Sequence, residues 1–368
     1  TKMKKKLLIF MPSIEGGGVE KNLFIISNFL AKKITKTMII TSNLNFKKKF
    51  KNQTVIIPKY KFNKSDGRYK RYFFCLYELI KQILYQKRNL VVFAFQANLY
   101  CAIICKIFNV DIITRSNSSP SGWSKSLIKK ILFNILLRIP KIIIVNSIKF
   151  KHEIKKKFGV NSLCIYNPLD KLDVLKKSKE KVKISFFDKE KKALKIVFVG
   201  RLVDQKDPLT FLKSLVIIKK KINFKSLILG RGVLKKDMLN FIKKNNLTKY
   251  VKIIKFQNNP YKYIAKSDLF VLTSKFEGLP NVLLEAQALK KPIVSSNCPT
   301  GPSEILLKGK AGSLFKIGNH TELANKIIYH YNNKKISIKK INLGYKYLYR
   351  FDYNVNLNKY FQVIKKYL

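Results

Sequence analysis

Acidic residues are scarce in this chain of 368 residues, where 20 Asp and Glu stand against 76 Lys and Arg and give a formal net charge of +56. Arginine is scarce too, because only eight of the 76 basic residues are Arg. Base readout and bidentate phosphate recognition favour Arg over Lys, so lysines spread along the whole chain argue against selected contacts with nucleic acid. Two explanations of the charge stay open: a bias in coding composition and attraction to an anionic membrane surface.

Cysteine is also rare, and its five positions are odd in number and scattered: Cys75, Cys101, Cys105, Cys164 and Cys298. Without a C-x-x-C pair they indicate neither zinc nor redox chemistry, and they favour a reducing cytosol. Long apolar runs are missing as well, since polar residues interrupt the most hydrophobic region, 90–113. The apolar stretch 7–11 is too short for a signal peptide, so we expect a first β-strand there.

Strand-like apolar runs alternate with helical patterns along the rest of the chain. This alternation predicts an α/β protein with parallel sheets covered on both faces. We expect two Rossmann-like domains that face each other across a cleft, with ligands at the carboxyl ends of the strands. The predicted boundaries are residues 1–170 for the first domain, 171–192 for a Lys-rich linker, 193–345 for the second domain and 346–368 for a C-terminal helix.

The stretch 276–285 places two carboxylates around the start of a predicted helix. Glu277 follows an apolar strand pattern at 269–273, Pro280 suits a first helical turn, and Glu285 lies in the helix predicted over 281–289. The free amides and positive dipole end of such a helix favour a phosphate, and the two carboxylates could accept hydroxyl groups beside it. Ordinary surface glutamates show the same spacing, so the motif needs independent support.

A second strand end supplies that support. The strand predicted at 196–200 is followed by a loop with Arg201 and Lys206, and then by Asp207 and Pro208, a typical N-cap and first helical residue. Both side chains could hold a diphosphate: Arg201 would bind it with the forked guanidinium, and Lys206 would act as a point charge. Both cations fall beyond the carboxyl end of their strand, as Glu277 does, so we expect them at one edge of the sheet.

Two further features have a functional and a plain structural interpretation. Three glycines, Gly16, Gly17 and Gly18, open the first predicted helix and would let a phosphate or acceptor approach the backbone, although a tight turn has the same pattern. Residues 124–138, preceded by the only tryptophan, Trp123, form a basic amphipathic helix pattern. Such a helix lies on an anionic bilayer or covers a sheet, and both alternatives stay open.

These motifs, taken in order, resemble the donor-binding domain of the retaining glycosyltransferases of family 4, which have the GT-B fold. The resemblance covers the second half of the chain strongly and the first half more loosely. The matching pieces are Val199-Gly-Arg201 with Lys206, Gly230-Arg-Gly232, the E-x7-E pair of Glu277 and Glu285, and, in the first half, Gly16-Gly-Gly-Val-Glu20 and Ile165-Tyr-Asn-Pro168.

The resemblance implies a role for each matched residue. Arg201 and Lys206 would hold the donor diphosphate, Glu285 the ribose, and Glu277 hydroxyls of the transferred sugar, with retention of configuration and without a bound metal or other cofactor. The donor-binding residues would also include Gly230, Gly278 and Leu279, and the catalytic residues would be Glu277, Arg201 and Lys206. The C-terminal helix, 346–368, would pack back toward the first domain.

This sequence departs from the family pattern at three places. Gly278-Leu-Pro-Asn-Val282 replaces the common Gly-Phe-Gly-Leu-Pro, and Arg231 stands where an acidic residue is usual. The first-domain histidine of many relatives is absent from the corresponding loop, 115–120, where Asn117 lies instead. The nucleotide contacts and the acceptor side therefore need separate tests.

The implied function is transfer of a hexose or N-acetylhexosamine from a UDP-sugar to a lipid-linked or membrane glycan acceptor in surface polysaccharide synthesis. The expected location is the cytoplasm, at the inner face of the cell membrane, where an anionic surface would attract the positive charge. Two alternatives stay open: a basic nucleic-acid-associated protein on the same scaffold, and a GT-B nucleotide-sugar epimerase.

Overall fold

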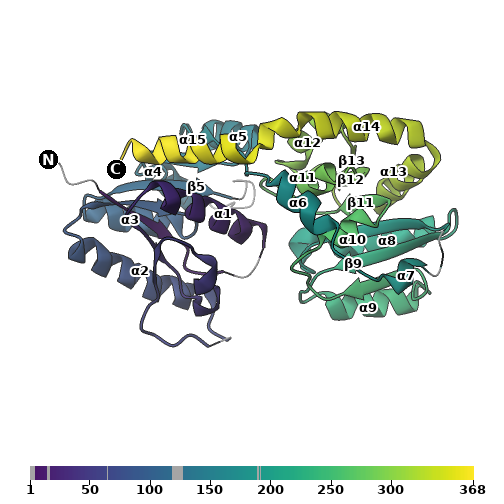
Figure 1. The fold of residues 1–368 in the computed structure, drawn as a ribbon, viewed down its shortest axis with the longest axis horizontal. Coiled ribbons are helices and arrows are strands. Elements are labelled where there is room, and N and C mark those ends of the chain that lie inside the picture. The colour runs from purple at the N-terminus through teal and green to yellow at the C-terminus, as the bar shows by residue number, and fades with distance from the viewer. Residues whose placement is uncertain (1–4, 15–16, 64, 118–126, 189, 191) are drawn as a thin grey trace. The chain divides into compact units, whose positions relative to one another are not determined.

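The computed structural model describes residues 5–14, 17–63, 65–117, 127–188, 190 and 192–368, with side chains from 131 onward in the helix that starts at 127. The chain forms two compact units (Figure 1). Unit 1 comprises Thr1–Pro168 and Tyr353–Leu368, and unit 2 comprises Leu169–Asp352. Within the described residues, every helix is too short or too polar to cross a lipid bilayer.

Unit 1 is built on a parallel sheet with the strand order β3-β2-β1-β4-β5-β6-β7. Because the chain fills positions β1 to β3 on one side and then crosses to β4, the order reverses between β1 and β4. The strands are β1 (Lys6–Phe10), β2 (Thr37–Ile40), β3 (Thr54–Ile56), β4 (Leu90–Ala94), β5 (Asp111–Ser116), β6 (Ile142–Val145) and β7 (Leu163–Cys164).

Helices cover both faces of this sheet. Successive residues of the buried strands point to opposite faces, and both sets are apolar, so both faces must be covered. Leu7 and Ile9 of β1 pack with α1 (Gly18–Lys33) and α15 (Tyr353–Lys365), while Leu8 and Phe10 pack with α2 (Arg68–Tyr85) and α3 (Asn98–Ile107). The helices α4 (Leu127–Leu136) and α5 (Ile148–Phe158) complete the unit, together with the 3-10 segment η1 (Leu44–Lys49). Cys101 and Cys105 of α3 are fully buried in the core that Leu8 and Phe10 share.

Arg115 of β5 is fully buried in unit 1 and connects two distant segments of the chain. Its Nε donates to the Tyr360 hydroxyl of α15 at 2.8 Å, and its Nη2 donates to Asn167 Oδ1 at 2.7 Å. Its Nη1 has no hydrogen-bond partner within the described part of the chain. A buried guanidinium with two neutral acceptors fixes both segments, because losing either contact would leave more of a buried cation unsatisfied.

Unit 2 has a second parallel sheet, in the order β10-β9-β8-β11-β12-β13. Here the order reverses between β8 and β11, which pair directly. The strands are β8 (Leu194–Val199), β9 (Phe224–Leu229), β10 (Val251–Ile254), β11 (Leu269–Leu272), β12 (Ile293–Ser296) and β13 (Ser313–Phe315). The helices and 3-10 segments are α6 (Lys171–Ser178), α7 (Ser185–Asp188), η3 (Asp204–Lys206), α8 (Pro208–Ile218), α9 (Lys235–Lys244), α10 (Tyr261–Ala265), α11 (Asn281–Ala288), α12 (Pro302–Ile305), η4 (Leu307–Gly309), α13 (His320–Asn332), α14 (Lys334–Lys346) and η5 (Tyr347–Phe351).

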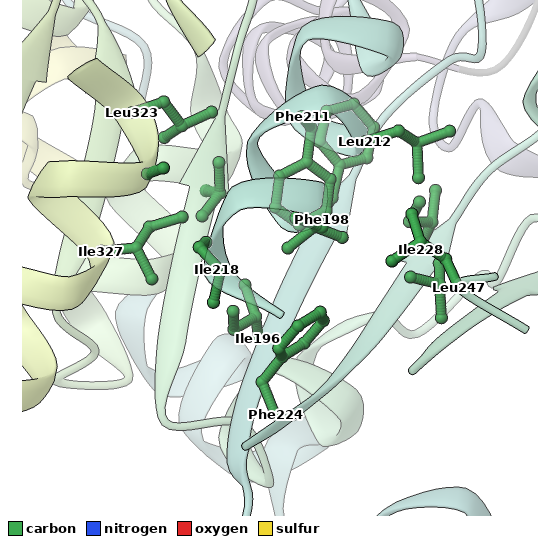
Figure 2. Packing of buried hydrophobic residues seen from close by; sticks show 14 of the residues in the cluster. Ile196, Phe198, Phe211, Leu212, Ile218, Phe224, Ile228, Leu247, Leu323 and Ile327 are labelled. Carbon is green, nitrogen blue, oxygen red and sulfur yellow. The ribbon is translucent and has the colours of Figure 1, made fainter. Parts of the chain in front are cut away.

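The core of unit 2 surrounds β8 (Figure 2). Phe198 of β8 and Phe211 of α8 stack with ring centroids 5.8 Å apart. Leu323 and Ile327 of α13 approach the same strand, and Phe224 of β9 lies near its amino end. This packing holds β8 rigidly, so the loop that follows it starts from a fixed point.

Two predicted boundaries differ from the structure. The segment 171–192, predicted as a linker, belongs to unit 2 and contains α6 and α7. The many lysines of this segment suggested an exposed linker. Three of its apolar side chains are nevertheless buried in unit 2: Val174, Ile184 and Phe187. The predicted C-terminal helix, 346–368, is divided: η5 ends in unit 2, and α15 belongs to unit 1 beside α1 (Figure 1).

Candidate functional site

The carboxyl ends of β8 and β11 form the part of unit 2 where the strand order reverses, which is where open α/β sheets bind ligands. Asp207 caps α8 by accepting from Thr210 N at 3.2 Å, and Pro208 is the first helical residue, as predicted. Asp207 has φ of 44°, an unusual conformation for a residue other than glycine. The Thr273 hydroxyl, just beyond β11, lies 2.8 Å from the carbonyl oxygens of Lys206 and Asp207 and holds this turn against the neighbouring strand.

Lys206 and Glu277 come from these two loops and form an ion pair between Nζ and Oε1. The Glu277 side chain is 8% exposed and the Lys206 side chain 17%, so the pair is shielded from water on most sides. Ser274 Oγ donates to the same Glu277 oxygen at 2.6 Å. Two donors fix the direction of this carboxylate, and its remaining acceptor capacity is open to a ligand hydroxyl.

Arg201 is linked to the Glu277 loop through Gln205. Arg201 Nη2 donates to Gln205 Oε1 at 3.0 Å, and Gln205 Nε2 donates to the Phe276 carbonyl at 3.1 Å. The Lys275 amide also donates to the Gln205 carbonyl at 2.8 Å. Arg201 itself is exposed, so its guanidinium can reach a solvent-borne anion while Gln205 sets its position. Sequence reasoning missed Gln205, because a single glutamine in a loop carries no pattern.

The end of β12 and the loop that follows it hold the loop that carries Glu277. Cys298 Sγ donates to the Ser274 carbonyl at 2.9 Å, and Ser296 Oγ donates to it at 2.6 Å. Burial raises the pKa of the Cys298 thiol to about 12, so it acts as a neutral donor and not as a nucleophile. Gly301 has φ of 86°, and a Cβ there would lie 1.9 Å from the Gly278 carbonyl oxygen, so a larger residue would displace this loop.

Glu285 lies in α11, which begins at Asn281 as predicted and has Pro280 as its N-cap. The Glu285 side chain is buried, and the Tyr261 hydroxyl of α10 donates to its Oε1 at 3.3 Å. Tyr261 is also buried and therefore limits the directions that the carboxylate can take. No sequence pattern indicates Tyr261, because its contact with Glu285 joins two helices.

Gly230 and Gly232 allow the turn after β9 to pass close to the loop that carries Arg201. A Cβ at Gly230 would lie 1.9 Å from the Gly200 carbonyl oxygen, and one at Gly232 would lie 2.2 Å from the Leu202 carbonyl oxygen. The predicted donor residues Gly278 and Leu279 are buried beside Glu277. The structure thus brings Lys206 and Glu277 into contact and places Arg201, Gly230, Gly278, Leu279 and Glu285 at the same end of the unit 2 sheet.

The glycine loop of unit 1 is separate from this cluster in the chain. Gly17 is the N-cap of α1, Gly18 is its first residue, and Gly16 lies outside the described residues, as do Trp123 and the start of the amphipathic segment 124–138. The Gly17 amide donates to Glu20 Oε2 at 2.8 Å, so a carboxylate of the chain binds this helix end. The role of Gly16 to Gly18 with a phosphate or acceptor stays a prediction. Among the residues that the structure describes, no three His, Cys, Asp or Glu side chains gather where they could hold a metal ion.

Comparison with protein families gives a match for the unit that carries these residues. Residues 179–346 match the model described as "Glycosyl transferases group 1". An uncharacterized glycosyltransferase of Methanocaldococcus jannaschii is 30% identical over 216 residues, which are 55% of this chain and 53% of that protein. The N-acetylgalactosamine-N,N'-diacetylbacillosaminyl-diphospho-undecaprenol 4-alpha-N-acetylgalactosaminyltransferase of Campylobacter jejuni is 28% identical over 61% of this chain and 62% of its own. The matches thus span between half and two thirds of these relatives.

The likeness to solved structures covers both units. The crystal structure of Anabaena Alr3699/HepE in complex with UDP-glucose is similar with a TM-score of 0.78 at 17% identity, over 98% of this chain and 100% of that one. Likeness at this identity shows the fold alone. Together with the two parallel sheets, it shows that the chain has the GT-B fold of two Rossmann-like domains, as predicted.

Proposed function

We propose that this chain is a retaining glycosyltransferase that moves a hexose or N-acetylhexosamine from a UDP-sugar to a lipid-linked or membrane glycan acceptor. The observation that carries the proposal is the contact between Lys206 and Glu277 at the point where the strand order of unit 2 reverses. A phosphate bound by Lys206 and a sugar hydroxyl bound by Glu277 would then be direct neighbours. That is the relation between the diphosphate and the transferred sugar in a nucleotide sugar.

The charges of the site suit departure of a nucleotide diphosphate. As the bond to the sugar breaks, negative charge develops on the diphosphate, and fixed cations lower the energy of that transition state. Arg201 and Lys206 would supply two such cations without a metal ion. Gln205 and the Thr273 hydroxyl hold their loop in place, so little reorganisation is needed when the charge appears.

The buried Glu285 would bind the two ribose hydroxyl groups, since a carboxylate accepts hydrogen bonds from both. Tyr261 already donates to one of its oxygens and would keep the carboxylate directed at the ribose. The UDP-glucose complex of the similar Anabaena structure and the diphospho-undecaprenol in the name of the Campylobacter relative support the choice of a UDP donor and a lipid-linked acceptor.

Thermal stabilisation by nucleotides tests the donor. A ligand that binds only the folded state at 100 times its Kd stabilises it by about 2.7 kcal/mol, so UDP should raise the unfolding temperature measurably. ADP and GDP are the matched controls. Equal stabilisation by all three would contradict a UDP site, and no stabilisation by any nucleotide or nucleotide sugar would contradict the proposed function.

Replacement of the two principal side chains tests their roles. We expect Arg201→Ala to lose about 100-fold or more in transfer while remaining folded, as for a lost donor to a developing charge. Glu277→Ala should also lose about 100-fold or more while remaining folded, because it removes the acceptor that would position the sugar hydroxyls. Lys236→Ala and Asp237→Ala remove one charge of each sign from exposed positions on α9 and serve as controls. Near-normal turnover in Arg201→Ala or Glu277→Ala would refute the role of that residue.

Product analysis separates the alternatives. Conversion of the donor sugar to its epimer in the absence of acceptor would favour an epimerase. Tight binding of duplex or single-stranded nucleic acid at physiological salt, without sugar transfer or hydrolysis, would favour a nucleic-acid-associated protein.

A further inference from the structure

The segments that follow β9 and β10 carry an exposed pair of side chains that has no role yet in the donor site. The Arg231 guanidinium lies over the Phe256 ring, with its Cζ atom 5.2 Å from the ring centroid. Arg231 is exposed and Phe256 is 46% exposed, so water reaches both partners. The pair therefore offers a ligand a planar ring and a planar cation at one place.

The pairing of β9 with β10 explains why these two side chains meet. The strands are parallel, and Leu229 lies opposite Ile254 in their register. The Gly230 amide continues the pairing by donating to the Ile254 carbonyl at 3.0 Å. Arg231 and Phe256 each come two residues after the paired positions, so their side chains leave on the same side of the sheet. The sheet itself thus positions the pair.

Backbone hydrogen bonds join Arg231 to the loop that carries Arg201. The Leu202 amide donates to the Arg231 carbonyl at 2.9 Å, and the Leu234 amide donates to the Leu202 carbonyl at 3.0 Å. In the strand order β10-β9-β8, two strand spacings, or roughly 10 Å, separate the strand before Phe256 from the strand before Arg201. This separation leaves room for a ribose between a diphosphate at Arg201 and a further group at Phe256.

The chain leads from Phe256 directly to the proposed ribose site. Tyr261 is the first residue of α10, and its hydroxyl donates to Glu285 Oε1 at 3.3 Å. Gln257, the neighbour of the ring, accepts a hydrogen bond from the Tyr263 hydroxyl at 3.2 Å. The segment after β10 therefore carries both the exposed ring and the tyrosine that orients Glu285.

The two partners together indicate the chemistry of the ligand. A phosphate would use Arg231 but not Phe256, and an apolar ligand would use the ring but not the guanidinium. A nucleobase uses both, because its π face stacks on aromatic rings and on guanidinium planes. Arg231 also stands where the resembled glycosyltransferases usually have an acidic residue, so the pair is a feature of this chain.

We propose that the uracil base of the donor stacks on Arg231 and Phe256. The assignment deepens the proposed function and rests on it, because it names the side chains that hold the base of the same nucleotide. Arg201 and Lys206 bind the diphosphate, Glu285 binds the ribose, and the cation–π pair binds the base. The pair thus strengthens binding of the whole nucleotide and leaves binding of a bare diphosphate unchanged.

Calorimetric titration of the full chain with UDP and with inorganic pyrophosphate tests the proposal. Arg231→Lys keeps the charge but loses the plane, and Phe256→Leu keeps an apolar side chain but loses the ring. Each variant should bind UDP about tenfold more weakly, as expected for a lost stacking contact, while its Kd for pyrophosphate stays within about twofold of wild type. The double variant should lose little more than either single variant, because the two side chains form one surface.

Three further variants serve as controls. Arg88→Lys changes an exposed arginine of unit 1, and Tyr349→Leu changes an aromatic residue of unit 2 that is 67% exposed. Both should bind UDP as the wild type does. Phe256→Trp keeps an aromatic ring and should retain the affinity for UDP, which separates stacking from a packing role. Circular dichroism spectra and unfolding temperatures check that every variant remains folded.

Several results would overturn the proposal. Wild-type UDP affinity in Arg231→Lys or in Phe256→Leu would refute the base site and leave the proposed function intact. Equal losses for UDP and pyrophosphate would show that the pair acts on the diphosphate or on the loop. A loss in Phe256→Trp as large as in Phe256→Leu would indicate packing. If the folded wild type binds no UDP, the proposed function fails together with the base site, so the two failures are distinguishable.

Discussion

The buried His330 predicts how unit 2 loses stability in acid. It lies on α13 and is 5% exposed. Its Nε2 is 2.9 Å from Ser313 Oγ of β13, and its Nδ1 is 2.7 Å from Ser337 Oγ of α14. Burial lowers the pKa of His330 to about 4, and the charges of Lys340 and Lys326 act in the same direction. The folded unit therefore holds a neutral imidazole between three elements.

The sign of the effect follows from proton binding. Above pH 6.5 the imidazole is neutral in both states, and the difference in pKa has no effect on the free energy of unfolding. As the pH falls from 6.5 toward 4, the unfolded chain binds a proton that the folded chain does not, so stability falls. One pKa unit corresponds to 1.36 kcal/mol, which gives a loss of about 2 kcal/mol at pH 5 and about 3 kcal/mol below pH 4.

Thermal unfolding at pH 5 to 7.5 measures this loss in wild type and in His330→Gln. The variant should be less stable at pH 7.5, because it loses part of the two serine contacts, but its unfolding temperature should fall less toward pH 5. The expected difference between the two slopes is about 4–8 °C over this range. His320→Gln changes a partly exposed histidine at the start of the same helix and should retain the wild-type slope. Parallel curves for wild type and His330→Gln would refute the reasoning.

Two further predictions concern the candidate donor site. In Gly230→Ala the new methyl group would lie 1.9 Å from the Gly200 carbonyl oxygen, so the Arg201 loop must move. We expect a lower unfolding temperature and at least tenfold weaker UDP binding. Gly67→Ala is the control and should change neither, because no atom lies within 4 Å of its new methyl group. Unchanged UDP binding in Gly230→Ala would contradict the close approach. Tyr261→Phe removes the hydroxyl that contacts Glu285, and we expect a several-fold rise in the donor KM with a nearly constant kcat. An equal fall in kcat and kcat/KM would instead place Tyr261 in transition-state stabilisation.

The sequence predicted those parts of the fold that depend on local patterns. The strand predicted at 269–273 is a short apolar run beside a turn, and the observed strand β11 ends one residue earlier. The helix predicted to start at Asp207 and Pro208 has a cap beside a turn, and the observed helix α8 starts there. The expected position of Lys206 and Glu277 followed from topology, because parallel strands bring their carboxyl ends to one edge. Their contact confirms that they share this edge.

Other features depend on contacts between distant residues and left no pattern. The segment 171–192 looked like a linker because lysines outnumber its apolar residues, yet Val174 and Phe187 are buried. Asn259 Nδ2 fixes the same segment by donating to the Lys177 carbonyl at 2.9 Å. Gln205 and Tyr261 position predicted site residues through single hydrogen bonds, which no periodicity or motif could indicate.

The contact of Arg115 with Tyr360 has a consequence for the order of events during synthesis. Unit 1 is interrupted by unit 2, and α15 is translated only after all of unit 2. Until then the face of the first sheet that receives Leu357, Tyr360 and Ile364 lacks its cover, and the Arg115 guanidinium lacks one of its acceptors. Domains tend to fold as units, so unit 1 can close only after all of unit 2 has been synthesised. A released chain truncated after Asp352 should therefore keep unit 2 resistant to protease and leave this face of unit 1 open to chaperones.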